Sequence, residues 1–263
     1  MRVATLNIWH DRGPWPERLP LIRHELARLK PDAIGLQEVL RDVSAPPTVD
    51  TCQALAIAHG LGYHVAYAPA APRDERSGVW QGRIWQGNAV LSPWPIRTRH
   101  VVPLPGADEA EPRALLYALV QTPLGDLPAF VTHLAWEPHH APLRLRQAAY
   151  VAAHVDALSP PGALPAVLLG DFNAEPDSVE MKYLCDAGFA DAWGDAAPGY
   201  TFDETNDYAR AAGEASCRID YILVRGSAAT PLDTRLAFTT PDRSGAAPVW
   251  PSDHFGVVTD LAL

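Results

Sequence analysis

The stretch Val167-Leu168-Leu169-Gly170-Asp171-Phe172-Asn173-Ala174 decides the fold class. Its first three residues are a short branched apolar run, typical of a buried strand, and prolines at 165 and 176 mark both ends. In α/β proteins the C-terminal ends of such strands carry ligands and chemistry. Asp171 and Asn173 are therefore expected either to bond local backbone groups in an Asx turn or to form a functional site. The stretch by itself supports both interpretations.

Composition indicates a globular protein that can bury a sizeable core. The chain has 263 residues, of which 48% are hydrophobic and 20% charged, and this length fits one large domain or two small ones. Strand-like and helix-like segments interleave throughout, without internal repeats or a linker-like change of composition. We therefore expect a single α/β domain over residues 1–263.

Charge and cysteine usage restrict the class of partner and the compartment. The net charge is −10, and Lys30 and Lys182 are the only lysines, which opposes tight sequence-independent binding to nucleic acid. The charge does not exclude a nuclease that binds its substrate at a local site. The three cysteines are far apart and show no CxxC spacing, which argues against a disulfide framework and a thiolate zinc site. With no secretory signal and no long apolar span, the sequence predicts a soluble, cytoplasmic protein.

The first elements have β-α-β order. Residues 3–8 predict a strand, residues 17–30 an amphipathic helix, and residues 33–36 a second short strand that ends at Gln37-Glu38. Such a unit implies a right-handed crossover. If the two strands are parallel neighbours, Asn7 and Glu38 emerge at the same edge of the sheet.

The rest of the chain continues this alternation. We expect strands at 63–67, 88–92, 219–224 and 257–263, an antiparallel pair at 114–121 and 127–134, helices at 49–59, 143–158 and 178–187, a surface loop at 69–87, and an irregular segment at 194–217.

Polar side chains recur next to the short apolar runs. Each of them alone has a structural interpretation as a turn residue, a helix cap or a core histidine. Their recurrence indicates a shared site, because packing has no reason to produce such a set. The residues are Asn7, Glu38, His133, Asp171, Asn173, Asp220, Asp253 and His254.

These residues lie in motifs that resemble, in order, those of the endonuclease/exonuclease/phosphatase superfamily. The superfamily includes DNase I-like nucleases, sphingomyelinases, inositol-polyphosphate phosphatases and deadenylases. The motifs are Thr5-Leu6-Asn7, Gly35-Leu36-Gln37-Glu38-Val39, Gly87-Asn88-Ala89-Val90-Leu91-Ser92, Val131-Thr132-His133-Leu134, Gly170-Asp171-Phe172-Asn173, Arg218-Ile219-Asp220-Tyr221 and Ser252-Asp253-His254-Phe255. The resemblance implies a four-layer sandwich of two packed mixed β-sheets flanked by helices, with the site at the top of the sheets.

The resemblance also implies a metal site and a set of catalytic residues. Glu38 would be the main metal ligand, with Asn7 and Asp253 close by. Mg²⁺ prefers such oxygen ligands, and Mn²⁺ or Ca²⁺ could substitute. Asp171 would orient or deprotonate the attacking water, and Asn173 would position that water or a phosphate oxygen.

Two histidines complete the implied site. His133 and His254 would donate hydrogen bonds to phosphate oxygens, and one of them would protonate the leaving group. Asp220 would hold a histidine, His254 in the first instance. Gly87-Asn88 occupies roughly the place where many relatives carry a carboxylate behind the first histidine, so the partner of His133 stays open.

Substrate contacts are expected from residues around this set. Arg113 sits where many members place a basic or hydroxyl group near the phosphate, and Asn88 lies near His133 in the motif order. Trp136, with His139-His140, would form a substrate-facing rim, unless it packs a loop onto the core. The predicted substrate contacts are therefore Arg113, Asn88 and Trp136.

Together these features predict an Mg²⁺-dependent hydrolase of phosphate esters. No serine or cysteine nucleophile with a neighbouring base is implied, so water attacks directly. The motifs are most similar to sphingomyelinase-like and small bacterial hydrolase members, which with the acidic charge favours a small or lipid-like phosphodiester or phosphomonoester. The alternatives are a nuclease and a non-catalytic phosphate-binding module, and the latter predicts loss of Asp171, Glu38 or His254.

Overall fold

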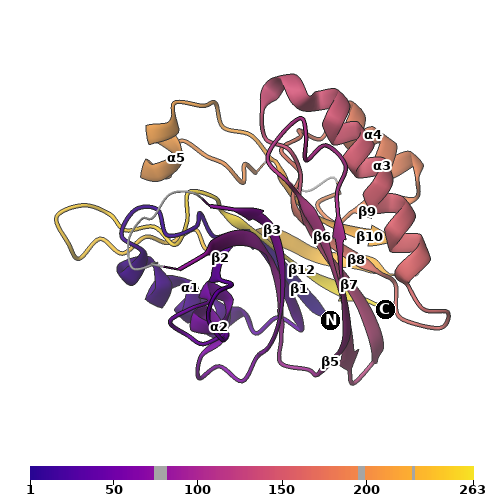
Figure 1. Ribbon diagram of the computed structural model, residues 1–263, viewed down its shortest axis with the longest axis horizontal. Helices are drawn as coiled ribbons and strands as arrows, with labels where there is room; N and C mark the ends of the chain where they lie inside the picture. Colours follow the sequence, from indigo (N-terminus) through magenta and orange to yellow (C-terminus); the bar gives the residue numbers. More distant parts are fainter. Residues whose placement is uncertain (74–81, 195–198, 227–228) are drawn as a thin grey trace.

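Two six-stranded sheets form the centre of the protein, shown in Figure 1 as a computed structural model that describes residues 1–73, 82–194, 199–226 and 229–263. The first sheet has the order β11-β12-β1-β2-β4-β3. Its strands are β1 (Arg2–Asn7), β2 (Ala33–Asp42), β3 (His64–Pro72), β4 (Ile84–Ser92), β11 (Thr230–Ala237) and β12 (Gly256–Ala262). The second sheet has the order β5-β6-β7-β8-β10-β9. Its strands are β5 (Ile96–Pro103), β6 (Ala114–Thr122), β7 (Gly125–His133), β8 (Val167–Asp171), β9 (Phe189–Asp191) and β10 (Asp220–Arg225).

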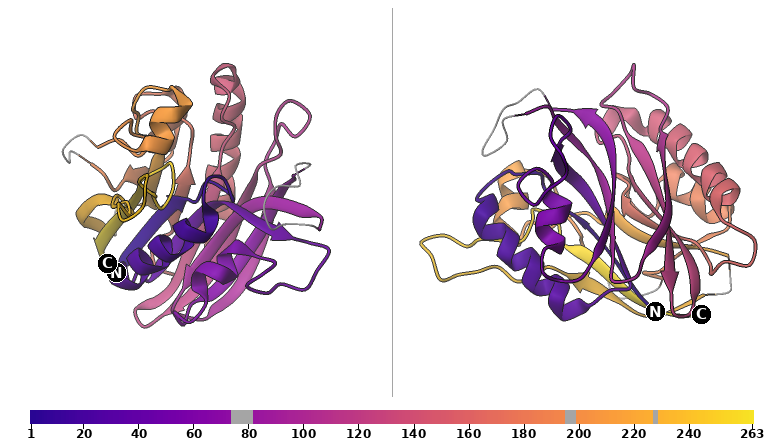
Figure 2. Two further views of the ribbon diagram at one scale, coloured as in Figure 1. Left: turned by 90° about the vertical axis from the view of Figure 1, so that its left-hand side faces the viewer. Right: turned by 60° about the horizontal axis from the view of Figure 1, so that its bottom comes forward.

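Helices cover the outer face of each sheet (Figures 1 and 2). On the first sheet lie α1 (Trp15–Leu29) and α2 (Gln53–Ala58), and on the second lie α3 (Ala141–Leu158) and α4 (Val179–Asp186). Ile22, Leu26 and Leu29 recur at helical spacing and pack α1 onto the sheet. Short helical turns η1 (Pro138–His140) and α5 (Asp207–Ala212) lie in loops. The predicted four-layer sandwich is confirmed.

The inner faces of the two sheets share one apolar core. Val3 and Val90 of the first sheet pack in it with Val131 and Leu169 of the second. Gly35 allows the close approach, because a Cβ atom at this position would lie 2.8 Å from Val131 Cγ2 and 2.9 Å from Leu169 Cβ. Since packed interiors leave no room for such overlap, any larger residue at position 35 would push the sheets apart.

Strand pairing gathers the polar residues at one edge of the sandwich. In the parallel pair β1–β2, Asn7 is the register partner of Gln37, which confirms that β1 and β2 are parallel neighbours. In the second sheet Asp171 pairs with His133 on β7 and with Asp220 on β10. Three predicted site residues thus stand on adjacent strands.

Strand β2 is longer than predicted. It does not end at Gln37-Glu38 but runs on to Asp42, and its register with β4 shifts between Leu36 and Val39. Glu38 has a φ of 58°, in the left-handed region. A bulge of this kind inserts an extra residue and redirects a side chain without ending the strand. This is how Glu38 reaches the site from within a strand.

The elements that the sequence did not predict are mostly strands at sheet edges. β5, β9 and β11 each pair on one side only, and β5 is exposed along most of its length. An edge strand of this kind lacks the apolar pattern that reveals a buried one. The predicted loop 69–87 is shorter, since β3 extends to Pro72 and β4 begins at Ile84, and its residues 74–81 lie outside the described residues. The segment 194–217 contains α5.

Among the described residues, no helix combines the length and the apolar character needed to cross a membrane.

Candidate active site

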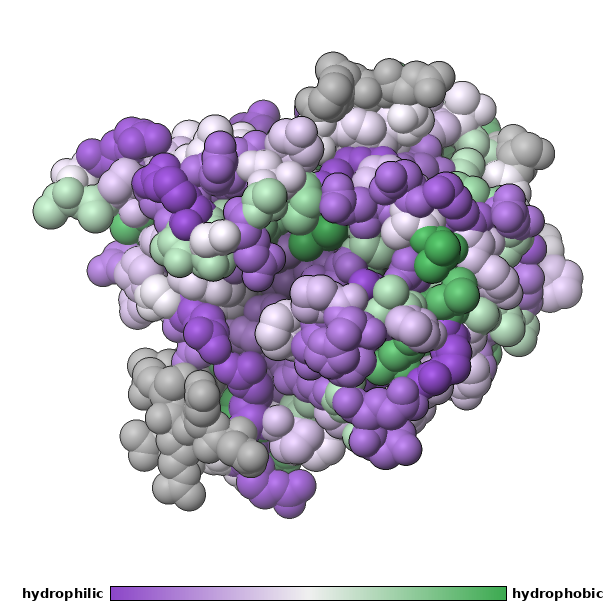
Figure 3. Space-filling model, turned by 90° about the horizontal axis from the view of Figure 1, so that it is seen from above, coloured by the Kyte–Doolittle hydropathy of each residue, from purple (hydrophilic) through white to green (hydrophobic). Residues whose placement is uncertain are grey.

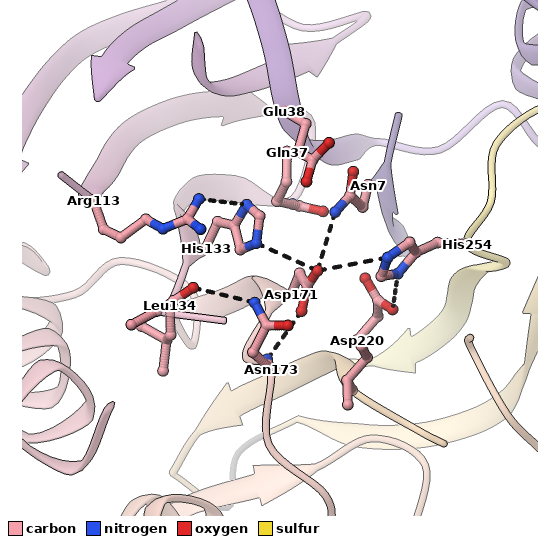
Figure 4. Close-up of polar contacts among 12 residues, drawn as sticks. Asn7, Gln37, Glu38, Arg113, His133, Leu134, Asp171, Asn173, Asp220 and His254 are labelled. Atoms are coloured by element: carbon pink, nitrogen blue, oxygen red, sulfur yellow. Dashed lines mark hydrogen bonds and ion pairs between the residues drawn. The ribbon is translucent and has the colours of Figure 1, made fainter. Parts of the chain in front are cut away.

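Asp171 lies at the centre of the site, at the end of β8, and is 1% exposed (Figure 4). Its Oδ2 accepts a hydrogen bond of 3.0 Å from Asn7 Nδ2. The same oxygen lies 3.5 Å from His133 Nε2 and 3.8 Å from His254 Nε2. One buried carboxylate oxygen therefore faces an amide and two imidazoles that come from three other segments of the chain.

Asn173 closes a turn on Asp171. Its backbone N–H donates to Asp171 Oδ1 at 2.9 Å, its φ is 48°, and its Nδ2 donates to Leu134 O at 3.2 Å. This is the Asx turn that the sequence offered as one of two interpretations. The turn and the polar cluster coexist, because Asp171 uses Oδ1 for the turn and Oδ2 for the cluster.

His254 is paired with Asp220, as predicted. Its Nδ1 lies 2.9 Å from Asp220 Oδ2, and both side chains are buried. Thr201 fixes this end of β10, because its Oγ1 accepts hydrogen bonds from the backbone N–H groups of Ile219 and Asp220. The His254 ring is thus held between two carboxylates, Asp220 on the Nδ1 side and Asp171 on the Nε2 side.

Burial and charge shift the pKa values of these groups in opposite directions. Burial, with the charge of Asp220, raises the pKa of Asp171 to about 7. Although burial alone would lower it, the pKa of His254 is raised well above its usual value by Asp220 and Asp253. Burial and the charge of Arg113 hold the pKa of His133 well below its usual value. The two histidines of the site therefore differ in charge near neutral pH.

Glu38 and Asp253 form an acidic side of the same site. Glu38 Oε2 lies 2.7 Å from His10 Nδ1, and although burial opposes it, this contact holds the pKa of Glu38 well below its usual value. Asp253 Oδ1 accepts a hydrogen bond of 3.2 Å from Ser252 Oγ. Burial, with Glu38 as a neighbouring negative charge, raises the pKa of Asp253 to about 6. Two half-buried carboxylates that repel each other fit a bound cation.

A second group of possible ligand atoms overlaps the histidine pair. Single atoms of Asp171, Asp220 and His254 lie within 4.8 Å of one another. His254 Nδ1 is already hydrogen-bonded to Asp220 Oδ2. The raised pKa of His254 favours the imidazolium, which cannot ligate a metal. Hard cations take oxygen ligands. The carboxylate oxygens of Glu38 and Asp253, which both line the cavity, therefore fit Mg²⁺ better.

A cavity of about 500 Å³ is lined by predicted site residues that include Glu38, His133, Asp171, Asp253 and His254, and the hollow is visible from above in Figure 3. Trp136 lies on its wall and is 55% exposed, as the predicted rim requires. The described residues that line the cavity do not include His139 or His140, and His140 Nδ1 lies 2.9 Å from Glu137 Oε2. The lining residues are Trp9, His10, Arg12, Glu38, Arg73, Glu111, Arg113, His133, Trp136, Asp171, Asn173, Phe202, Ala212, Glu214, Ile219, Asp253 and His254.

The two other predicted substrate contacts lie in different surroundings. Arg113 lines the cavity and is buried, with Nη1 3.1 Å from His133 Nδ1. Asn88 is buried behind the cavity wall, where its Nδ2 donates to Ala114 O at 2.8 Å and to Val131 O at 3.4 Å. Asn88 thereby joins β4 of one sheet to β6 and β7 of the other, and its contact with substrate stays a prediction.

Sequence reasoning missed several residues that support the site. Arg18 on α1 is fully buried and donates to Ile8 O and Pro251 O, both at 2.9 Å, which ties the segment after β1 to the segment before Asp253. His10 and Glu111 contact predicted residues directly. Both lie within three residues of a predicted one, Asn7 or Arg113, which is the only signal that the sequence offered.

Known proteins share the sequence pattern and the fold of this chain. A sequence model of the Endonuclease/Exonuclease/phosphatase family matches residues 4–254. No curated protein matches the sequence significantly. A solved endonuclease/exonuclease/phosphatase from Beutenbergia cavernae is 30% identical, with a TM-score of 0.76 over 100% of this chain and 71% of that one.

More distant structures share the fold. They include a mannosyl-6-phosphatase from Bacteroides thetaiotaomicron, with 20% identity, a TM-score of 0.76 and full coverage of both chains. Truncated TDP2 from Caenorhabditis elegans has 21% identity and a TM-score of 0.75, over 100% of this chain and 97% of that one. With the family's sequence pattern spanning nearly the whole chain, this protein belongs to the endonuclease/exonuclease/phosphatase family, whose members hydrolyse phosphate esters.

Proposed function

We propose that this protein is a metal-dependent phosphoesterase that hydrolyses a small or lipid-like phosphodiester or phosphomonoester by direct attack of water. The observation that carries the proposal is the convergence of Asn7, His133 and His254 on one oxygen of Asp171, a buried residue that lines the cavity. Glu38 and Asp253, with Asn7, would hold Mg²⁺, or Mn²⁺ or Ca²⁺ in its place. The bound cation would neutralise charge on a phosphate oxygen.

The reaction uses the charged forms of two groups: His254, whose raised pKa favours the imidazolium, and Asp171, whose pKa of about 7 leaves part of it ionised near neutral pH. Ionised Asp171 accepts a proton from water as the water oxygen bonds to phosphorus, and Asn173 helps to position that water. As the bond between phosphorus and the leaving oxygen breaks, His254 gives its Nε2 proton to that oxygen, while Asp220 stabilises the imidazolium. His133 donates a hydrogen bond to a phosphate oxygen. Protons and bonds balance: a diester gives an alcohol and a phosphate monoester, and a monoester gives an alcohol and inorganic phosphate.

Size and charge of the cavity favour a small substrate. A volume of about 500 Å³ is in the range of small-molecule sites, on the order of 300–1,000 Å³. Trp9, Trp136 and Phe202 add apolar wall. Among the described lining residues, three arginines, at positions 12, 73 and 113, are outnumbered by five carboxylates, at positions 38, 111, 171, 214 and 253. This charge balance differs from the basic stripe that a nuclease would need. The free cysteines support a cytoplasmic location.

The test is an assay with Mg²⁺ and with Mn²⁺ against a panel of phosphate esters. The panel holds an aryl phosphodiester, sphingomyelin, inositol phosphates, single- and double-stranded DNA, and RNA. We expect metal-dependent release from a small or lipid-like ester, abolished in Asp171→Ala on every ester and in His254→Ala on the esters with an alkyl leaving group. Asp177→Ala and His154→Ala are the matched controls, because Asp177 is exposed and His154 bonds only its own helix.

Each outcome of the panel has a definite meaning. Activity on DNA or RNA alone would replace the proposed substrate class by a nuclease. Metal-dependent activity that survives both Asp171→Ala and His254→Ala would overturn the mechanism. Binding of phosphate without turnover of any ester would indicate a phosphate-binding module.

A further inference from the structure

His133 has an arginine where His254 has a carboxylate. Arg113 Nη1 lies 3.1 Å from His133 Nδ1, and both side chains are buried. A guanidinium nitrogen only donates hydrogen bonds. His133 Nδ1 must therefore be the acceptor and carry no proton. The neutral ring then bears its proton on Nε2, the nitrogen that faces Asp171 Oδ2 at 3.5 Å.

The opposite logic holds for His254. Asp220 Oδ2, 2.9 Å from His254 Nδ1, accepts hydrogen bonds and stabilises a proton on that nitrogen. Protonating His133 in the same way would set Nδ1–H against the N–H groups of Arg113, so the two rings cannot exchange roles.

Glu111 holds Arg113 in place. Its Oε2 lies 3.1 Å from Arg113 Nη2, while its Oε1 accepts a hydrogen bond from Gln86 Nε2. Gln86 Oε1 in turn contacts His10 Nε2, and His10 Nδ1 lies 2.7 Å from Glu38 Oε2. This chain of side chains runs from the acidic side of the cavity to His133, through residues that are buried or half-buried.

We propose that Glu111 is a positioning residue that, through Arg113, locks His133 as a neutral Nε2–H donor and so leaves His254 as the proton donor of the reaction. The inference deepens the proposed function and rests on it for its catalytic part. Glu111 balances the buried charge of Arg113 and fixes the planar guanidinium, whose two outer nitrogens then point at Glu111 and His133. Without Glu111, Arg113 is free to turn toward Asp171 or substrate, and the ring of His133 loses its fixed tautomer.

The first measurement is ¹⁵N NMR of the histidine rings in metal-free protein near neutral pH, with His133 and His254 assigned from His133→Gln and His254→Gln. We expect one ring with a bare Nδ1 and a protonated Nε2, assigned to His133, and a ring protonated on Nδ1, assigned to His254. A His133 ring that is protonated on Nδ1 would overturn the proposal. This readout needs no substrate, so it stands whether or not the proposed activity is found.

The second measurement compares Glu111→Gln with Glu109→Gln. Glu109 is a matched control two residues away, since it pairs with Arg146 on the surface and does not line the cavity. For Glu111→Gln we expect a mixture of His133 tautomers and a loss of about tenfold or more in kcat, with a smaller change in KM. Glu109→Gln should match wild type in both readouts.

Two results would contradict the role of Glu111. One is an unchanged His133 spectrum in a folded Glu111→Gln variant. The other is a kinetic loss confined to KM, which would make Glu111 and Arg113 a substrate-binding pair only. If Glu111→Gln does not fold, Arg113→Lys provides the same test, because lysine has no planar fork to span Glu111 and His133.

Discussion

His133 and His254 face the same oxygen of Asp171, yet the protein surrounds them with opposite charges. Asp220 lies behind His254 at 2.9 Å, whereas Arg113 lies behind His133 at 3.1 Å. The carboxylate favours an imidazolium and the guanidinium opposes one. One residue type thus supplies two functions, a proton donor and a neutral hydrogen-bond donor, and the difference lies in the neighbour of Nδ1 and not in the ring itself.

The largest expected effect is a loss of kcat that depends on the leaving group of the substrate in a His254 variant but not in a His133 variant. We expect His254→Ala to lower kcat on an alkyl phosphate ester by up to about 10⁴-fold, because a poor leaving oxygen needs its proton. On an aryl ester the loss should be much smaller. His133→Ala should cost about 10²-fold on both esters, as loss of one oriented donor does. Steady-state kinetics on the ester pair checks this, and equal leaving-group dependence in both variants would break the distinction.

Asp220→Asn is expected to have the next largest effect. The amide keeps the shape of the side chain but removes the charge that raises the pKa of His254, so this pKa should fall toward its ordinary value. We expect kcat to fall by up to about 100-fold. NMR titration of the His254 ring gives the pKa shift directly. A drop in activity with an unchanged pKa would assign Asp220 an orienting role only.

The dependence of rate on pH sharpens the same comparison. Asp171 works as a base only when it is ionised, and its pKa is raised to about 7. The rate of turnover should therefore rise about tenfold per pH unit below pH 7, and fall again at higher pH, where His254 loses its proton. In Asp220→Asn the falling limb should move to lower pH. A rate that decreases on raising the pH from about 5 to about 7 would exclude Asp171 as the base.

The smallest effect concerns stability. The pKa of Asp171 is about 7 in the folded protein and 3.8 when unperturbed, so the folded state binds more protons between these values. Its contribution to the free energy of unfolding therefore falls as pH rises from about 4 to about 7. We expect metal-free Asp171→Asn to melt a few °C above wild type at about pH 8, and the gain to vanish near pH 4. Asp177→Asn is the control, and equal melting of Asp171→Asn and wild type at both pH values would contradict the raised pKa.

Much of the fold could be read from apolar periodicity. The runs that became β1, β8 and β10 are buried on both faces, and burial on both faces produces the continuous apolar stretches by which such strands are found. The strands β5, β9 and β11 were not predicted because they are exposed or very short edge strands, which lack such an apolar stretch. The bulge that carries Glu38 within β2 also left no trace in the pattern, since Leu36 and Val39 look alike on either side of it.

The sequence by itself determined which residue types are available to the site. Asp171, Asp220, His133 and His254 each follow or open a short apolar run, and that placement depends only on local chain chemistry. The tertiary structure alone decided which groups face each other. Glu111 and Arg113 lie in the loop just before β6, Gln86 lies in β4, and His10 follows β1. Only the packing of the two sheets brings these residues into one chain of contacts. Proton positions follow from such contacts, because a histidine takes its tautomer and charge from whatever lies beside each nitrogen in space.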